Sequence, residues 1–240
     1  MPIAVNPLHA QPVDGRLALA ALWPSRCLAC GECGQPGRDL CRRCAGTLPW
    51  NRVACPTCAL PLPAPAVECG ACLQRRPPLG AVHAAFVYAR PLDRLLPRFK
   101  FHGDLAAGRL LSQLLADACA SWTRPDALVA VPLHRSRLRQ RGYDQALELT
   151  RPLARALRLP LRRDLLHRHQ ATAAQSELSA AARRRNVRDA FVADATQAPP
   201  AHVVLVDDVM TTGATLHAAA NALRRAGVTR VDAWVCARVP

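Results

Sequence analysis

The stretch VVLVDDVMTTGATL, from Val203 to Leu216, decides the fold of this chain. Its aliphatic residues predict a buried strand, and Asp207 and Asp208 stand at the end of that strand. A loop rich in threonine follows, and a helical pattern begins at Gly213 and stops at Gly227. Because two adjacent carboxylates repel each other, their position directly after a buried strand indicates a functional site.

A strand, a loop rich in threonine and glycine, and a helix N-terminus together predict a site for a phosphate group. The backbone N–H groups of Thr212 to Thr215 would point into this loop, and the helix dipole adds partial positive charge there. Beside such a phosphate, the two carboxylates would accept hydrogen bonds from vicinal hydroxyls, and a ribose 5-phosphate presents both groups.

Two other interpretations of this stretch stay open. Asp-Asp in a magnesium site of a nucleotide hydrolase would require a G-x4-G-K-[ST] loop, but the only lysine of the chain, Lys100, lies elsewhere. An aspartate helix cap followed by an ordinary threonine turn would need no ligand at all.

The chain after residue 77 alternates strands and helices. Strands are expected at 81–89, 127–132, 203–208 and 228–239, and helices at 104–120, 144–159 and 213–226. Pro152 lies inside the second of these helices, where it is expected to kink or divide it. The alternation predicts a parallel sheet covered by helices on both faces, with ligands bound beyond the carboxyl ends of its strands.

Nine of the eleven cysteines lie between Cys27 and Cys72, and all of them but Cys33 form two copies of the pattern C-x2-C-x10-C-x2-C that are 28 residues apart. The spacing predicts two structural Zn2+ sites, because four thiolates complete a tetrahedral site and leave no open position. An apo or redox cluster is the alternative. Spacing alone does not separate neighbouring from interleaved pairs of knuckles, although shorter loops favour neighbours. The eight candidate ligands are Cys27, Cys30, Cys41, Cys44, Cys55, Cys58, Cys69 and Cys72.

The charge and hydropathy of the sequence limit which partners and which compartment are expected for the chain. The formal net charge is +15, but 31 of the 32 basic residues are arginines, a bias that lowers the weight of the total. Residues 133–188 carry 14 arginines against four acidic residues, a net of +10. This suits a phosphate-rich ligand or nucleic acid, and a solvated arginine-rich face is the alternative. With no apolar run as long as a membrane span and no clear export signal, a cytoplasmic protein is expected.

The stretch VLVDDVMTTGAT resembles the phosphoribosyl-diphosphate-binding signature of type I phosphoribosyltransferases. The whole chain resembles the ComF family of competence-associated, amidophosphoribosyltransferase-like proteins. The four cysteine knuckles, RFKFHGD (98–104), VPLHRSRLRQRGYDQA (131–146) and QSELSAAARRRNVRDAF (175–191) stand in the order of that family. One departure is Asp144, where the family usually has asparagine.

The resemblance implies an α/β fold, with a type I phosphoribosyltransferase-like parallel sheet flanked by helices and preceded by a small zinc-binding module in which four cysteines form each site. The expected parts are an N-terminal segment 1–26, a double zinc-ribbon module 27–76 and a phosphoribosyltransferase-like domain 77–240. Asp207 and Asp208 would hold the 2- and 3-hydroxyls of a ribose. The 5-phosphate loop would consist of Thr211, Thr212, Gly213, Ala214 and Thr215, and the diphosphate loop of Pro132, Leu133 and His134.

Lys100 and Arg141 are the expected catalytic residues. A single lysine in a chain full of arginine suggests a position that needs a compact ammonium, here in contact with the diphosphate, and a chance surface lysine is the alternative. Arg135 and Arg137 would supply further charge. Residues 168–186 stand where related transferases have a mobile lid, and the same segment would also pass as a plain solvated helix.

The resemblance implies that the protein binds phosphoribosyl diphosphate with Mg2+, carries two structural Zn2+ ions and acts in DNA uptake or the use of external DNA. Transfer of the phosphoribosyl group to an unknown acceptor is expected if the protein is an enzyme. The alternative is a non-catalytic module that binds single-stranded DNA beside the DNA-uptake proteins and only senses phosphoribosyl diphosphate. A regulator without chemistry is a third interpretation.

Overall fold

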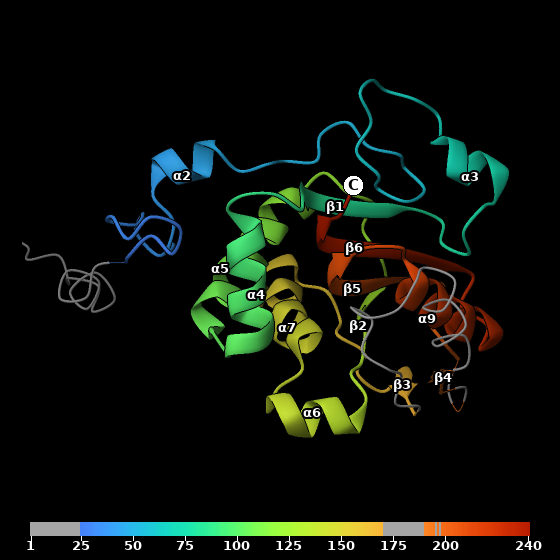
Figure 1. Ribbon diagram of the computed structural model, residues 1–240. Helices are drawn as coiled ribbons and strands as arrows, with labels where there is room; N and C mark the ends of the chain where they lie inside the picture. Colours follow the sequence, from blue (N-terminus) through green and yellow to red (C-terminus); the bar gives the residue numbers. More distant parts are fainter. Residues whose placement is uncertain (1–24, 170–189, 195, 197) are drawn as a thin grey trace, which may run out of the picture. The chain divides into compact units, whose positions relative to one another are not determined.

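The computed structural model describes residues 25–169, 190–194, 196 and 198–240 (Figure 1). The chain divides into two compact units, Met1–Thr47 and Leu48–Pro240, and the division falls between the two cysteine repeats. The first unit contains the short helix α2 (Arg42–Gly46). The expected domain boundary between residues 76 and 77 stays a prediction. Within the described part of the chain, no helix is long and apolar enough to cross a membrane.

The second unit is built on a four-stranded parallel sheet. Its strand order is β1-β6-β5-β2, and every neighbouring pair is parallel. The predicted parallel sheet is therefore confirmed. Its strands are β1 (Val82–Val87), β2 (Ala127–Ala130), β5 (His202–Met210) and β6 (Arg230–Arg238).

Helices cover both faces of this sheet (Figure 1). On one side α5 (Leu105–Cys119) and α7 (Gln145–Leu157) pack on each other; α7 also contacts β2 and β5, and α5 contacts β1 and β6. On the other side α9 (Ala214–Arg225) contacts β5 and β6. All three helices were expected from apolar spacing. Pro152 lies inside α7 without dividing it.

The alternation of side chains along β5 explains why both layers form. Val203 and Leu205 belong to the apolar core that includes α9, and Val204 and Val206, the residues that alternate with them, are fully buried as well. Because successive side chains of a strand point to opposite faces, a continuous aliphatic run requires cover on both sides.

Several short elements were not expected from the sequence. The helix α4 (Leu92–His102) precedes α5, and α6 (Arg135–Arg141) precedes α7. A small antiparallel pair joins β3 (Leu166–Arg168) to β4 (Phe191–Ala193), beside α9. The helix α3 (Gly70–Gln74) follows Cys69 in the second cysteine repeat.

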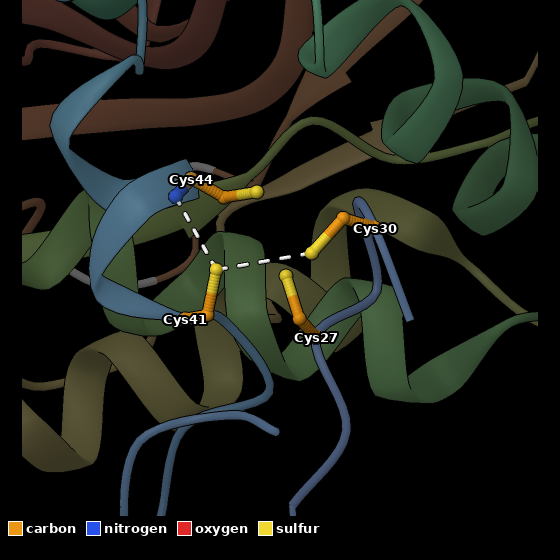
Figure 2. Close-up of side chains that lie close together, drawn as sticks. All are labelled: Cys27, Cys30, Cys41 and Cys44. Atoms are coloured by element: carbon orange, nitrogen blue, oxygen red, sulfur yellow. Dashed lines mark hydrogen bonds between the residues drawn. The ribbon is translucent and has the colours of Figure 1, made fainter. Parts of the chain in front are cut away.

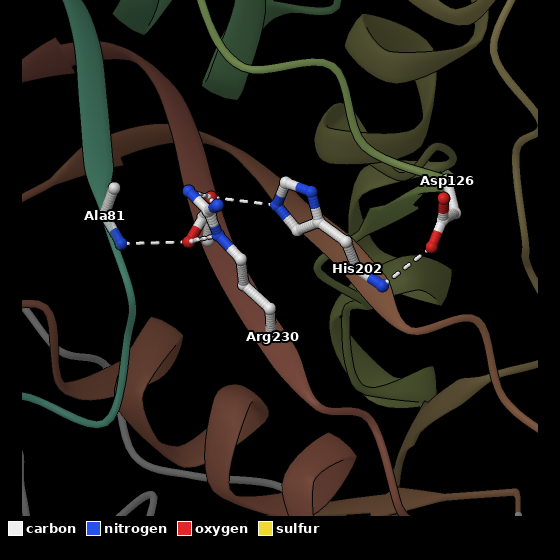
Figure 3. Close-up of polar contacts among 5 residues, drawn as sticks. Ala81, Asp126, His202 and Arg230 are labelled. Carbon is white, nitrogen blue, oxygen red and sulfur yellow. Dashed lines mark hydrogen bonds and ion pairs between the residues drawn. The ribbon is translucent and has the colours of Figure 1, made fainter.

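A polar cluster around Asp232 connects strands at the end of the sheet where β5 and β6 begin (Figure 3). Asp232 is 2% exposed, and its carboxylate lies 2.8 Å from His202 Nε2 and 2.8 Å from Arg230 Nη2. It also accepts a hydrogen bond of 2.9 Å from the backbone N–H of Ala81, just before β1. One buried acid therefore connects three strands.

We expect Asp232→Ala to lower the free energy of unfolding by about 2–4 kcal/mol, because it leaves partly buried donors on Ala81 and His202 without their buried acceptor. Arg230→Ala is the matched control, and it should cost about 1 kcal/mol or less, since the Arg230 side chain is 46% exposed. Urea unfolding followed by circular dichroism measures both values. Equal losses in the two variants would contradict the central place of Asp232.

Candidate functional site

A cleft lies at the carboxyl ends of β2 and β5, where the parallel sheet predicted it. Lys100 reaches it from α4, and Arg137, Arg141 and Gln145 reach it from the region of α6 and α7. Of the predicted catalytic residues and the predicted residues of the two phosphate loops and the carboxylate pair, all but His134 line this cleft. The predicted residues that line it are Lys100, Pro132, Leu133, Arg141, Asp207, Asp208, Thr211, Thr212, Gly213, Ala214 and Thr215.

An ion pair joins α4 to the end of β5 inside the cleft. The Nζ atom of Lys100 lies 2.8 Å from Oδ2 of Asp208, and the Asp208 side chain is 2% exposed. The other oxygen of Asp208 accepts the N–H of Val209 at 2.9 Å, and Oδ1 of Asp207 accepts the N–H of Asp208 at 2.9 Å. Asp208 is therefore held in place by a cation and a backbone donor.

The two carboxylates have opposite pKa shifts. Burial raises the pKa of Asp207 well above its usual value, and the charge of Asp208 adds to the rise. Burial would also raise the pKa of Asp208, but the adjacent Lys100 ammonium outweighs it and the pKa is lowered. Burial would lower the pKa of Lys100, and the two carboxylates more than offset it, so this pKa is raised. Asp208 and Lys100 therefore remain charged as a pair.

The loop after β5 leads into the N-terminus of α9. Gly213 is the N-cap of this helix and has a φ of 75°, in the left-handed region that favours glycine. A Cβ at this position would also lie 2.5 Å from Cε of Met210 and 2.9 Å from Nε2 of His217. The positive φ favours glycine here, and a Cβ would also require the Met210 and His217 side chains to shift. The first turn of α9, which begins at Ala214, adds its dipole to the cleft.

Three arginines give the cleft an excess of positive charge. Arg168, at the end of β3, is 8% exposed and lies over the ring of Phe191 at 5.3 Å. Burial lowers its pKa to about 10, and the neighbouring charge of Arg137 acts in the same direction. Arg141 donates to Oε1 of Gln145 at 2.9 Å and lies 5.2 Å from the centre of the Phe101 ring. With Lys100, four cations face two carboxylates.

Asp144 fixes the turn in which the diphosphate loop was expected. Its Oδ2 accepts the N–H of Leu133 at 3.1 Å, and its Oδ1 accepts the N–H of Leu147 at 3.0 Å, which caps α7. The neighbouring His134 instead caps α6, with Nδ1 accepting the N–H of Ser136 at 3.2 Å. Pro132 and Leu133 therefore line the cleft, whereas His134 serves the helix beside it.

The first cysteine repeat gathers its four sulfurs in one place (Figure 2). The Sγ atoms of Cys27, Cys30, Cys41 and Cys44 all lie within 4.8 Å of one another, and Cys30 and Cys41 are 3.8 Å apart. A tetrahedral Zn2+ with Zn–S bonds of about 2.3 Å would place its sulfurs about 3.8 Å apart. The geometry therefore fits the predicted zinc site.

The second repeat forms an equivalent cluster in the other unit. Its ligands are also within 4.8 Å of one another, and the sulfurs of Cys58 and Cys69 are 3.6 Å apart. Neighbouring knuckles therefore pair, as loop length favoured, and each repeat makes a site of its own. Cys33, Cys119 and Cys236 are outside both sets. The cysteines of the second set are Cys55, Cys58, Cys69 and Cys72.

Sequence reasoning did not single out two residues that line the cleft. Gln145 carries no signal of its own in the sequence, and Arg168 was included only as the first residue of the expected lid. The rest of the expected lid, from residue 170 onward, lies outside the residues that the structure describes. The expected charge donor Arg135 is not among the residues that line the cleft, whereas Arg137 is.

Comparisons with known proteins agree with both parts of the chain. The double zinc ribbon domain family matches residues 18–73, and the phosphoribosyl transferase domain family matches residues 144–240. Competence protein F of Haemophilus influenzae is 38% identical over 159 residues, which are 63% of this chain and 69% of that protein. The DNA utilization protein YhgH of Escherichia coli O157:H7 is 35% identical over 234 residues, which are 93% of this chain and 94% of that protein.

A solved structure of glutamine phosphoribosylpyrophosphate amidotransferase from B. subtilis is 23% identical with a TM-score of 0.36; the match covers 52% of this chain and 25% of that one. The sequence relatives decide the family. Because the matched regions span more than two thirds of both relatives, at 38% and 35% identity, this chain belongs to the ComF family of competence-associated proteins.

Proposed function

We propose that the cleft binds phosphoribosyl diphosphate, and that the protein uses this ligand in the uptake or use of external DNA. The observation that carries the proposal is the position of Asp207 and Asp208 beside the loop that precedes α9, with four cations around them. The relatives named for competence and DNA utilization support the cellular role.

The three parts of the ligand match three parts of the cleft. The N-terminal turn of α9 and the hydroxyls of Thr211, Thr212 and Thr215 suit the 5-phosphate. The twin carboxylates suit the ribose hydroxyls, and Asp208 is the member that stays ionised as an acceptor. Lys100, Arg137 and Arg141 line the remaining side of the cleft, where the diphosphate would lie.

A magnesium ion fits this site only as a companion of the ligand. In the described residues, the groups of three or more candidate metal ligands are the two cysteine sets, so the cleft supplies no preformed cage for a cation. Mg2+ commonly takes one or two carboxylates and completes its shell with waters and phosphate oxygens. Asp207 is the residue that would hold it, since Asp208 is engaged by Lys100. When bound, the ion would neutralise diphosphate charge.

Transfer of the phosphoribosyl group would break the bond between carbon 1 and the diphosphate and form a bond between carbon 1 and a nucleophilic atom of the acceptor. Negative charge then collects on the leaving diphosphate, and Lys100 and Arg141 are placed to stabilise it. Arg168 adds a buried guanidinium on the β3 side of the cleft. We propose Lys100 and Arg141 as the catalytic residues of this step.

Single-stranded DNA is a second candidate ligand, because α6 has arginine at alternate positions and no acidic residue. Arg137 and Arg141 line the cleft, whereas Arg135 and Arg139 are exposed. The exposed pair could track a phosphate backbone at the rim of the cleft. Both ligands could bind the same protein, since the two pairs of arginines lie at different places on the helix.

Titration calorimetry of phosphoribosyl diphosphate with Mg2+ tests the main proposal. The double variant Asp207→Asn/Asp208→Asn should bind on the order of 100-fold more weakly, because both carboxyl groups that face the ribose hydroxyls are replaced by amides and the charged acceptor Asp208 is lost. Asp164→Asn is the matched control, since that carboxylate is exposed beside Arg162, and it should bind like the wild type. An unchanged affinity in the folded double variant would remove the ribose from this position.

The position of Lys100 is expected to require an ammonium group, so that arginine does not replace it without loss of affinity. Lys100→Arg is expected to weaken phosphoribosyl diphosphate binding about 10-fold, because the larger planar guanidinium does not fit the position that the compact ammonium occupies between the buried Asp208 and the diphosphate. Lys100→Met should weaken it further. Calorimetry measures both, and wild-type affinity in the arginine variant would discard the diphosphate contact.

Lys100→Met should also change how stability depends on pH. Without the ammonium, burial raises the pKa of Asp208 in the folded protein instead of leaving it lowered. The folded state then binds more protons than the unfolded state above about pH 4, so stability falls as the pH rises. Urea unfolding at pH 5 and pH 8 should show a larger loss at pH 8 in this variant than in wild type, and a parallel course would contradict the ion pair.

The salt dependence of the affinity for single-stranded DNA tests the second proposal. Arg135→Gln/Arg139→Gln should reduce the slope of log K against log salt for an oligodeoxythymidine by about 1.4, since each phosphate contact on a single strand contributes about 0.7. The control Arg224→Gln/Arg225→Gln removes the same charge from the exposed end of α9 and should leave the slope unchanged. Fluorescence anisotropy measures the slopes, and equal slopes in the two variants would reject α6 as the contact.

A further inference from the structure

The two cysteine clusters have different surroundings. In the first cluster Cys27 is buried, Cys30 is exposed and the other two are intermediate. In the second cluster all four cysteines are buried, and they belong to the same apolar core as Met210, Ala214 and the strands of the parallel sheet. A metal in the second cluster would therefore sit in the folded unit that also contains the cleft.

Arg238 connects that second cluster to the strand that ends in the cleft. It is the last residue of β6, and its Nε donates to the backbone carbonyl of Cys58 at 3.0 Å. Its Nη1 donates to the carbonyl of Met210 at 3.4 Å and to the carbonyl of Val239. One guanidinium thus bridges a cysteine knuckle and the last residue of β5.

Met210 carries this connection into the phosphate loop. Its carbonyl also accepts the N–H of Val239 at 3.0 Å, so β5 is joined to the residue after β6 at this end. Its side chain lies against Gly213, so closely that a Cβ there would come within 2.5 Å of Cε. Met210 directly precedes Thr211, so a shift of its backbone is passed directly to the start of the loop that precedes α9.

Zinc binding at the second cluster would act on the Arg238 bridge from the side of the cysteine knuckle. Four thiolates around one Zn2+ fix the positions of both knuckles, and structural zinc supplies much of the folding energy of such small segments. Without the metal, backbone hydrogen bonds and packing alone hold the Cys55–Cys58 knuckle, so the carbonyl that Arg238 binds is held less firmly. Zinc at this cluster would order Cys58, then Arg238, then Met210.

We propose that Arg238 is a positioning residue that couples the second cysteine cluster to the phosphate loop, so that zinc in this cluster raises the affinity of the cleft for phosphate esters. The inference rests on the proposed function, because it assigns the 5-phosphate to the loop at residues 211–215. It gives the second ribbon a role in ligand binding beyond its own folding.

The test uses ribose 5-phosphate as the probe, because it lacks the diphosphate and reports on the phosphate loop and the adjacent carboxylates without the diphosphate side of the cleft. Arg238→Met in the zinc-loaded full chain should retain two equivalents of zinc and bind ribose 5-phosphate about 10-fold more weakly. Arg230→Met is the matched control, since it makes the same change at the other end of β6 and should bind like wild type. Calorimetry measures affinity, and atomic absorption measures zinc.

A thermodynamic cycle distinguishes coupling from two separate defects. Cys72→Ser should lose one zinc equivalent and weaken ribose 5-phosphate binding about 10-fold, and the double variant with Arg238→Met should be no weaker than either single variant. Reciprocity adds a readout that does not need Cys72→Ser to fold. Ribose 5-phosphate should lower zinc release from the second cluster to a chromogenic chelator at equilibrium in wild type but not in Arg238→Met.

The outcomes separate the inference from the proposed function. If wild type binds neither ribose 5-phosphate nor phosphoribosyl diphosphate, the proposed function fails. If wild type binds and Arg238→Met binds equally well, or if zinc release ignores the ligand in wild type, the coupling is wrong and the proposed function stands.

Discussion

The ion pair between Lys100 and Asp208 is the constraint on which the site depends. Two adjacent carboxylates after a buried strand would repel each other and would raise both pKa values, and a buried pair of this kind would favour neutral acids. The ammonium from α4 reverses this for one of them and leaves Asp208 ionised at 2% exposure. A buried charge is costly unless it is paired and hydrogen-bonded, and Asp208 has both the ammonium and the N–H of Val209. The position of α4 is therefore tied to the chemistry of β5.

The parallel sheet separates the requirements of stability from those of binding. At the end where β5 and β6 begin, Asp232 is satisfied by His202, Arg230 and a backbone N–H, so its polar groups have partners within the protein. At the other end, cations outnumber acids, and the first turn of α9 presents backbone donors to the cleft. Helix dipoles and strand ends give parallel sheets this polarity. A surplus of positive charge beside helix-terminal N–H groups is what an anionic ligand requires.

The sequence was sufficient for features whose signal is local. Three such features are the aliphatic run before Asp207, the glycine that caps α9 and the two cysteine repeats. In each of them a short stretch of sequence is enough to predict the structure. The helix α6 was missed because alternate arginines in RSRLRQR give no apolar face, and α4 was missed because Pro97 lies inside its pattern. The contact between Lys100 and Asp208 joins residues far apart in the sequence, and spacing carries no information on such a pair. The separate surroundings of the two cysteine clusters are likewise a product of packing, since the two repeats have the same spacing.

Asp144 shows how a single departure from a family pattern can be explained by geometry. Its two oxygens accept two backbone N–H groups, one from Leu133 in the turn at the cleft and one from Leu147 in α7. An asparagine has only one side-chain oxygen, so its amide nitrogen would face one of these donors and the turn would need another arrangement. Burial raises the pKa of Asp144, and the backbone N–H groups of Leu147, Leu133 and Ala146 oppose that rise. The carboxylate therefore supplies one more acceptor than an amide would, and it holds the turn at Leu133 to the start of α7.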